Sequence, residues 1–312
     1  MSRTLFDRLI RLLLLFTRLY LRHAPGCFGK AFVFERIYKP YLGWRHMSLQ
    51  ARTLFGARVS VQLPDLIQSR IYLFGQWEPA ITRFVQATLK PGDTFIDVGA
   101  NIGYYSLLAA HCVGSTGRIY AIEASPDIAA TMRANIARNR CTQVDLIEAA
   151  ASDHCHEIAL YSGGSVNLGA TTTHAGWASR MGFAMEARVS ARPLADMIPR
   201  EALLGARLIK IDVEGAEAAV IGGIATLLGQ FSIHTQWIME LSPNMSDTHR
   251  DSVHGIWQQF HAAGYHAYHL INNYRIAEYT DRVPAPGPLV RLEAAPDAMV
   301  DVVFSRTVPW VA

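Results

Sequence analysis

The sequence lacks long hydrophobic segments and has few cysteines. The apolar stretch Leu12–Phe16 near the N-terminus is far shorter than the about 20 residues that cross a bilayer. It is also short for the core of a signal peptide, and no small-residue cleavage site follows it. The 4 cysteines show no CxxC spacing, so we expect neither a disulfide framework nor a zinc site, and a reducing, cytoplasmic location is favoured.

Several catalytic motifs are also missing. The 12 histidines include no HExxH pair, which disfavours zinc catalysis. The triplet His154-Cys155-His156 has no nucleophile-elbow context, which disfavours a cysteine hydrolase. Half of the residues are hydrophobic, so the chain has enough apolar material for a core and is not a disordered protein.

Charge is distributed unevenly along the chain, although the net charge is only +3. Residues 1–60 hold 11 of the 29 Lys and Arg residues but 2 of the 26 Asp and Glu residues, so this segment carries +9 and the remainder −6. A basic segment of this kind favours an anionic partner. We expect no nucleic-acid binding, because no motif or aromatic stacking platform for it is present.

Residues 3–22 predict a basic amphipathic helix, which ends near Ala24-Pro25-Gly26. Two interpretations remain open. The helix either lies in a membrane interface as a peripheral contact, or docks on the body or on a second copy of the chain, as in a homo-oligomer, with its arginines merely solvated. One side of the helix carries Arg8, Arg11, Arg18 and Arg22, and the other carries Leu5, Leu9, Leu12, Leu13, Phe16, Leu19 and Tyr20.

Short apolar segments alternate with helical patterns from residue 94 onward, which predicts an α/β fold with a doubly wound, mostly parallel, seven-stranded sheet. A polar, Ser/Gly/Thr-rich stretch interrupts this rhythm at about residues 157–204, and we interpret it as an insertion over the edge or mouth of the sheet. The expected strands are residues 94–100, 118–124, 144–151, 207–213, 237–241, 265–271 and 299–305; expected helices include 77–89, 104–111, 127–139 and 252–263. A further strand is expected at residues 58–63.

The first strand of this sheet runs into a glycine-containing turn, and the second ends in an acid. Gly99, Asn101 and Gly103 form a GxNxG pattern, which differs from the GxGxxG of dinucleotide-binding turns. Glu123 closes the next strand, where an acid typically holds the two ribose hydroxyls of an adenosine. The combination fits S-adenosylmethionine or a nicotinamide cofactor, and the turn sequence favours the former.

The segments DTFIDVGANIGYYSLLAA, IYAIEASPD, IKIDVEGAE and MELSP resemble FkbM-type S-adenosylmethionine-dependent methyltransferases. The resemblance covers about residues 72–305 and implies a Rossmann-like class I methyltransferase fold. It also implies methyl transfer to a hydroxyl, often of a sugar or glycosylated compound. We therefore expect a basic N-terminal extension over residues 1–71 and a methyltransferase domain over residues 72–312.

The resemblance also implies roles for individual residues at the cofactor site. The loop against the methionine part of the cofactor would contain Asp97, Gly99, Asn101 and Gly103, and Glu123 would bind the ribose. The adenine would be flanked by Ser125 and by the segment that contains Ala151, and Glu78 would lie over the mouth.

Three carboxylates are expected at the catalytic mouth, because they lie at strand ends. Asp212 and Glu214 follow the fourth strand, and Glu240 is in the fifth. They either bind and deprotonate an acceptor hydroxyl or hold a divalent cation. In the first case Asp212 is the first candidate for the base. Asp212 is also expected to contact the cofactor. Lys210 is expected to point away and solvate the sheet end. Two alternative functions remain, a nicotinamide-dependent oxidoreductase and a non-catalytic, membrane-associated binding module.

Overall fold

The fold is described from a computed structural model, in which residues 3–26, 28–163, 171–173, 175–243, 247–272, 274–280 and 289–309 are described. The side chains of residues 3–7 lie outside this description, including Leu5 of the expected apolar helix side.

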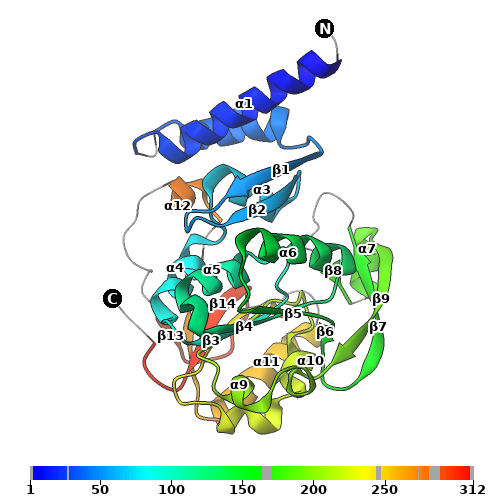
Figure 1. Ribbon diagram of the computed structural model, residues 1–312. Coiled ribbons are helices and arrows are strands. Elements are labelled where there is room, and N and C mark those ends of the chain that lie inside the picture. The colour runs from blue at the N-terminus through cyan, green and yellow to red at the C-terminus, as the bar shows by residue number, and fades with distance from the viewer. Residues whose placement is uncertain are drawn as a thin grey trace.

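The centre of the molecule is an eight-stranded sheet, which confirms the α/β class (Figure 1). Five strands are parallel, and β14 enters antiparallel between β11 and β12. The strand order is β13 (Val290–Leu292), β12 (His266–His269), β14 (Val300–Ser305), β11 (Gln236–Leu241), β10 (Leu208–Ile211), β3 (Thr94–Val98), β4 (Arg118–Glu123), β5 (Val144–Glu148). The eighth strand, β13, was not predicted, because three largely exposed residues give no hydrophobic pattern.

Helices cover both faces of the sheet, so the core forms two apolar layers (Figure 1). One layer packs under α4 (Pro79–Thr88), α5 (Tyr104–Val113) and α6 (Pro126–Asn139). The other packs against α8 (Leu194–Met197), α9 (Arg200–Leu204), α10 (Glu217–Gly222), the 3-10 helix Ala225–Gln230 and α11 (Asp247–Ala262). Helix α6 begins one residue before the predicted start, because the Ser125 side chain caps it and Pro126 occupies its first turn.

The expected insertion forms a second, four-stranded sheet beside the first. Its order is β6 (Ala150–Ala151), β9 (Ala184–Arg192), β7 (His156–Ser162), β8 (Thr171–Thr172), and α7 (Ala175–Met181) precedes β9. The strand expected over residues 144–151 is therefore two strands, because β5 ends at Glu148 and residues 150–151 pair with β9 instead.

The N-terminal extension contains more structure than one helix. It comprises α1 (Arg3–His23), α2 (Lys30–Val33), the π-helix η1 (Phe34–Leu42), the antiparallel pair β1 (Met47–Arg52) and β2 (Arg58–Leu63), and α3 (Leu66–Phe74). Strand β2 joins the body because its Ser60 backbone N–H donates to Asn135 Oδ1 of α6 at 2.8 Å. The expected boundary at residue 71 falls inside α3, and a short helix α12 (Ile276–Thr280) lies near α2. Among the described helices, none is both long and apolar enough to cross a membrane.

Candidate active site

The strand order reverses between β3 and β10, and this is the point where doubly wound sheets bind ligands. Gly99 follows β3 with φ +80, and a Cβ there would lie 1.9 Å from the backbone oxygen of Asp212, which follows β10. The Asp212 N–H in turn donates to the Val98 carbonyl at 3.0 Å. Only glycine, which has no Cβ, allows the two strand ends to approach this closely. The glycine in the predicted turn is therefore required for steric reasons.

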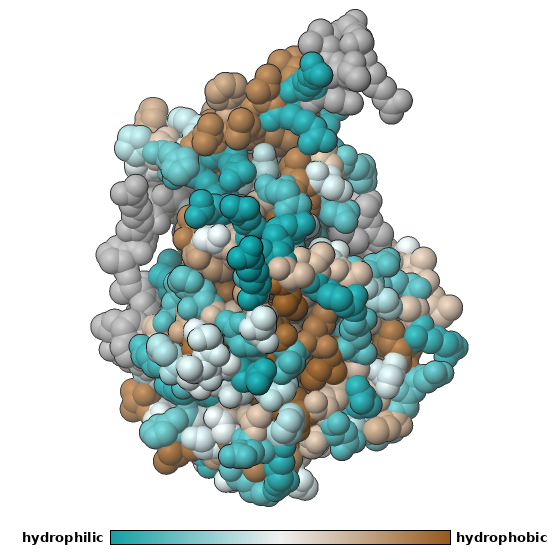
Figure 2. All heavy atoms as spheres, viewed as in Figure 1, coloured by the Kyte–Doolittle hydropathy of each residue, from teal (hydrophilic) through white to brown (hydrophobic). Residues whose placement is uncertain are grey.

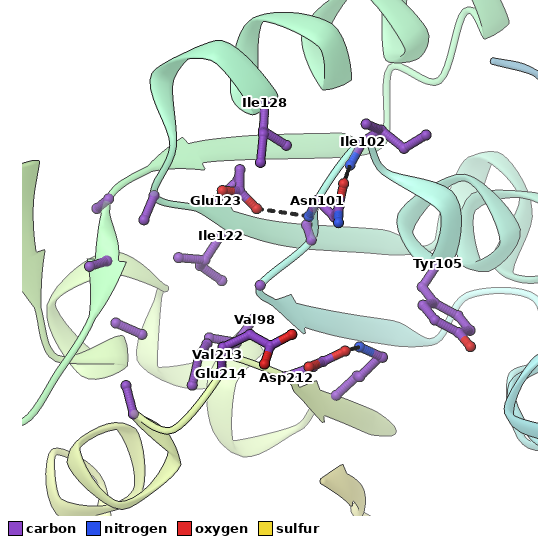
Figure 3. Close-up of a pocket in the computed structure, with 18 of the residues that line it drawn as sticks. Val98, Asn101, Ile102, Tyr105, Ile122, Glu123, Ile128, Asp212, Val213 and Glu214 are labelled. Carbon is purple, nitrogen blue, oxygen red and sulfur yellow. Dashed lines mark hydrogen bonds and ion pairs between the residues drawn. The ribbon is translucent and has the colours of Figure 1, made fainter. Parts of the chain in front are cut away.

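Glu123 is held at the edge of the same pocket by two backbone amides, of which Figure 3 shows that of Asn101. The Asn101 N–H donates to its Oε2 and the Ser125 N–H to its Oε1, each at 2.8 Å. Burial raises the pKa of Glu123 to about 7, although these amide hydrogen bonds oppose the shift. Asn101 adopts a left-handed conformation with φ 52, and its side-chain oxygen accepts from the Ile102 N–H at 2.7 Å.

The rest of the pocket is mostly apolar and is partly closed by the insertion. Ile122 and Ile128 lie near Glu123, and Ala151 contributes to the wall as expected. Leu160 of β7 and Thr173 belong to the insertion and also line the pocket, which supports the interpretation of that segment as a cover over the mouth. The further walls are formed by Ile67, Trp77, Val98, Ala100, Ile102, Tyr104, Tyr105, Ala124, Ala149, Ala150, Val213 and Ala216.

Three of the expected cofactor residues lie behind the pocket wall rather than on it. Asp97 is buried, accepts from Ser106 Oγ at 2.6 Å, and has its pKa raised by burial; its Oδ1 has no hydrogen-bond partner among the described residues. Gly103 begins α5 against Met132, where an added Cβ would lie 3.0 Å from Cγ. The Ser125 hydroxyl accepts from the Ile128 N–H at 3.3 Å and donates to Glu186 of β9.

Lys210 lies among the carboxylates, so the expectation that it solvates the sheet end is wrong. Its buried ammonium donates to Asp212 Oδ2 at 2.8 Å and lies 5.0 Å from the centre of the Tyr105 ring. The negative charges of Asp212, Asp97 and Glu78 outweigh the cost of burying the ammonium and raise the pKa of Lys210. Lys210, Asp212 and Tyr105 all line the pocket.

Glu78 lies at the N-cap of α4 and is linked to the far end of the chain. Its Oε2 accepts from Tyr105 OH at 2.7 Å, and its Oε1 accepts from Tyr274 OH at 2.9 Å and Asn272 Nδ2 at 3.1 Å. Burial raises its pKa, and its backbone has φ 40. Glu78 does not line the pocket, so its expected place over the cofactor mouth is not seen.

Glu214 and Glu240 lie beside Asp212 and repel its charge. Glu214 lines the pocket with φ 50, and burial followed by the charges of Asp212 and Glu240 raises its pKa to about 8. Glu240 is not on the pocket wall; burial and the charges of Asp212 and Glu78 raise its pKa to about 7. It pairs across the sheet with Asp301 of β14, whose buried carboxyl accepts from Asn272 Nδ2 at 3.1 Å.

The structure thus unites Asp212 and Glu214 at the pocket and adds polar residues that sequence reasoning missed: Lys210, Tyr105, Asn272, Tyr274 and Asp301. Of these residues, Asp301 could most readily have been found from the sequence. It lies near the start of the antiparallel strand β14, and the start of an antiparallel strand is at the same edge of the sheet as the ends of the parallel strands. In the part of the chain that the structure describes, no group of three or more His, Cys, Asp or Glu side chains could hold a metal ion. The alternative that these carboxylates hold a divalent cation therefore has no support.

A central parallel sheet with β14 antiparallel near its edge, and a pocket at the strand reversal, defines a class I methyltransferase fold. The family model of the methyltransferase FkbM domain matches residues 97–267, which is more than half of the chain. The chain therefore belongs to the FkbM methyltransferase family. This assignment confirms the resemblance and leaves the nicotinamide alternative without support.

Similarity to individual proteins is short or distant. The protein-L-isoaspartate O-methyltransferase of Aeropyrum pernix is 45% identical over 47 residues, 15% of this chain and 18% of that protein. The arsenite methyltransferase of Halobacterium salinarum is 32% identical over 59 residues, 19% of this chain and 15% of that protein. The crystal structure of methyltransferase FkbM from Methylobacillus flagellatus KT has a TM-score of 0.40 at 12% identity, covering 76% of this chain and 52% of that one.

Proposed function

We propose that this protein transfers a methyl group from S-adenosylmethionine to a hydroxyl oxygen, of a sugar or glycoconjugate. The observation that carries this proposal is the position of Asp212 and Glu214. Both line the pocket that Glu123 borders, and both belong to the cluster of carboxylates around Lys210. One cavity thus combines the features of a nucleoside site with groups that can orient and deprotonate an acceptor.

The residues present fit this cofactor. Glu123 offers a carboxylate for a ribose diol, and the apolar side chains of Ile122 and Ile128 with the small residues of 149–151 suit a flat purine. The turn at Gly99 and Asn101 would receive the amino-acid part. When bound, S-adenosylmethionine supplies a methyl group already activated by a positively charged sulfur. The excess of carboxylates around Lys210 favours a cationic ligand at this position.

We assign proton removal to Glu214 rather than to Asp212. One oxygen of Asp212 accepts from the Lys210 ammonium, which suits it to orient an acceptor hydroxyl. Glu214 has no such cation at hydrogen-bond distance among the described residues, and its pKa of about 8 makes its ionised form a stronger base than an ordinary carboxylate. A positioned base with a pKa near the working pH contributes about 10²–10⁴-fold to rate.

A hydroxyl-rich acceptor is supported by the polar groups beyond the pocket. Asn272 and Tyr274 donate to the carboxylates of Glu78 and Asp301 beside Glu240, and Asn272 Oδ1 has no hydrogen-bond partner among the described residues. The remaining acceptor capacity of these groups suits a ligand with several hydroxyls. Water exclusion would come from the insertion, through Leu160 and Thr173.

The test supplies the protein with methyl-labelled S-adenosylmethionine and with matched panels of sugars, amines and thiols. The proposal predicts label in an alkali-stable methyl ether of a sugar, and a loss of about 10²–10⁴-fold in kcat for Glu214→Gln with cofactor affinity retained. Labelling confined to the amines or thiols would refute oxygen as the acceptor atom. Equal turnover by Glu214→Gln would refute the assigned base.

A further inference from the structure

Helix α1 packs against the rest of the protein through one side only. Ile10, Leu14, Thr17 and Leu21 are buried and recur at helical spacing, so they form the contact line with the body. Helix α1 packs on α3 and on η1. This contact uses only part of the helix circumference and leaves most of its leucines outside.

Arginine side chains strengthen this docking. Arg22 donates to the carbonyls of Ile71 at 2.9 Å, Tyr72 at 2.8 Å and Leu73 at 3.1 Å, near the C-terminal end of α3. Its remaining amino group donates to the Arg52 carbonyl at 2.8 Å. The Arg18 guanidinium lies 5.1 Å from the centre of the Tyr72 ring. These two arginines face the body, whereas the interpretation of a docked helix had all four merely solvated.

The opposite side of α1 presents large apolar side chains to solvent. Phe16 is 65% exposed, Leu9 53% and Leu12 51%, and Leu13 and Leu19 are exposed beside them. Figure 2 shows brown, hydrophobic surface along α1 at the top of the molecule. A continuous apolar face of this kind is unusual on a soluble monomer and marks a surface that binds something. We call these five residues the leucine face.

Basic side chains accompany the leucine face on the same helix. Arg8 and Arg11 are exposed on α1. A separate groove is lined by Ile10 and Arg11 of α1 and by Tyr41 and Trp44, which are 67% and 70% exposed. Amphipathic rings beside cationic side chains are typical of the boundary between lipid headgroups and acyl chains.

We propose that the leucine face inserts into the interface of a membrane that contains anionic lipids. Apolar burial would be provided by the leucines and Phe16, and Arg8 and Arg11 would pair with lipid phosphates. The charge of residues 1–60 favours a lipid surface over a pairing of two leucine faces, because two segments of +9 would repel each other whereas an anionic surface attracts one.

The docking also connects this surface with the pocket. Helix α3 provides the carbonyl of Ile71 to Arg22 and, one turn earlier, the side chain of Ile67 to the pocket wall. A membrane bound at α1 would therefore hold the catalytic domain at a defined position above the lipid.

The test is flotation of the full chain with phosphatidylcholine vesicles, with and without phosphatidylglycerol. We expect partition onto the anionic vesicles, weakened at about 1 M salt, where the Debye length falls to about 3 Å. The double variant Leu12→Glu/Phe16→Glu should lower partition by about tenfold or more. The matched control is Ile233→Glu, which changes a 56% exposed residue on the body and should leave partition unchanged. S-adenosylmethionine binding and the circular dichroism spectrum verify that each variant is folded.

Three results would overturn the proposal. The first is no partition onto either vesicle type, and the second is equal partition by the double variant and the wild type. The third is a dimer in lipid-free light scattering that the double variant abolishes, because the leucine face would then be covered by a second copy.

Discussion

Replacing Glu214 by Gln removes a carboxyl that the folded protein protonates more readily than the unfolded chain does. Its pKa is about 8 in the folded state against an ordinary 4.5, because burial and the charges of Asp212 and Glu240 disfavour the ionised form. Below pH 4.5 the carboxyl is protonated in both states and carries no penalty. As the pH rises from about 4.5 to about 8, the unfolded chain releases the proton first, so the free energy of unfolding falls.

The size of this effect follows from the same two values. A pKa raised from 4.5 to about 8 corresponds to at most about 5 kcal/mol at high pH. Glu214 is only partly shielded from water, and solvent screening reduces the expected loss to about 1–2 kcal/mol. The Glu214→Gln variant has no ionisable group at this position, so its free energy of unfolding does not fall in this way. Its unfolding free energy should therefore match that of the wild type near pH 5 and exceed it by about 1–2 kcal/mol near pH 9.

The assay is urea unfolding of both proteins at intervals from pH 5 to pH 9, read by fluorescence and circular dichroism. Converging stabilities near pH 5, and a gap that widens up to about pH 8 and then stays constant, support the reasoning. Two parallel curves would refute it, because they would mean that Glu214 keeps an ordinary pKa in the folded protein. The activity of the wild type should rise with pH toward about 8 as Glu214 becomes ionised.

Further predictions concern the backbone and the N-terminal docking. Gly99→Ala places a Cβ 1.9 Å from the Asp212 carbonyl oxygen at φ +80, so it should lower the unfolding free energy by at least about 2 kcal/mol and abolish cofactor binding; a normal melting temperature would contradict the close approach. Arg140→Gly relieves a left-handed residue at the end of α6, with φ 56, and should raise stability by about 0.5–1 kcal/mol without changing activity, as thermal unfolding and turnover will show. Arg22→Met keeps the apolar stem but removes the hydrogen bonds to the α3 carbonyls, so limited proteolysis should cut within residues 3–26 faster; an unchanged cleavage rate would mean that these bonds do not hold α1.

The sequence predicted those features whose cause is local. The apolar segments that became β3, β4, β10 and β11 are buried, and the cap at Ser125 starts α6. Gly99 and Glu123 could be found because parallel pairing places the ends of the consecutive strands β3 and β4 at one edge. The strands and the helix start depend on residues within a few positions of one another, and the two site residues depend only on the parallel order of neighbouring strands.

The remaining features depend on contacts between distant segments. Lys210 lies within an apolar strand, and its buried ammonium is stabilised by the charges of Asp97 and Glu78, which are far away in the sequence. Helical periodicity predicted a basic and an apolar side for α1 but not which side packs against the body. That choice depends on Arg22, whose partners are main-chain carbonyls about fifty residues away in sequence. Main-chain carbonyls carry no sequence signal.

Calorimetric titration of the protein with S-adenosylmethionine and, separately, with NAD tests the cofactor assignment. We expect micromolar affinity for S-adenosylmethionine, about −8 kcal/mol, and no binding of NAD. Glu123→Ala should raise Kd by tenfold or more, because charged hydrogen bonds of about 1.5–3 kcal/mol each are lost. The matched control is Glu148→Ala, at the cross-strand position beside Glu123, which should bind as the wild type does. Binding of NAD, or unchanged S-adenosylmethionine affinity in Glu123→Ala, would contradict the account.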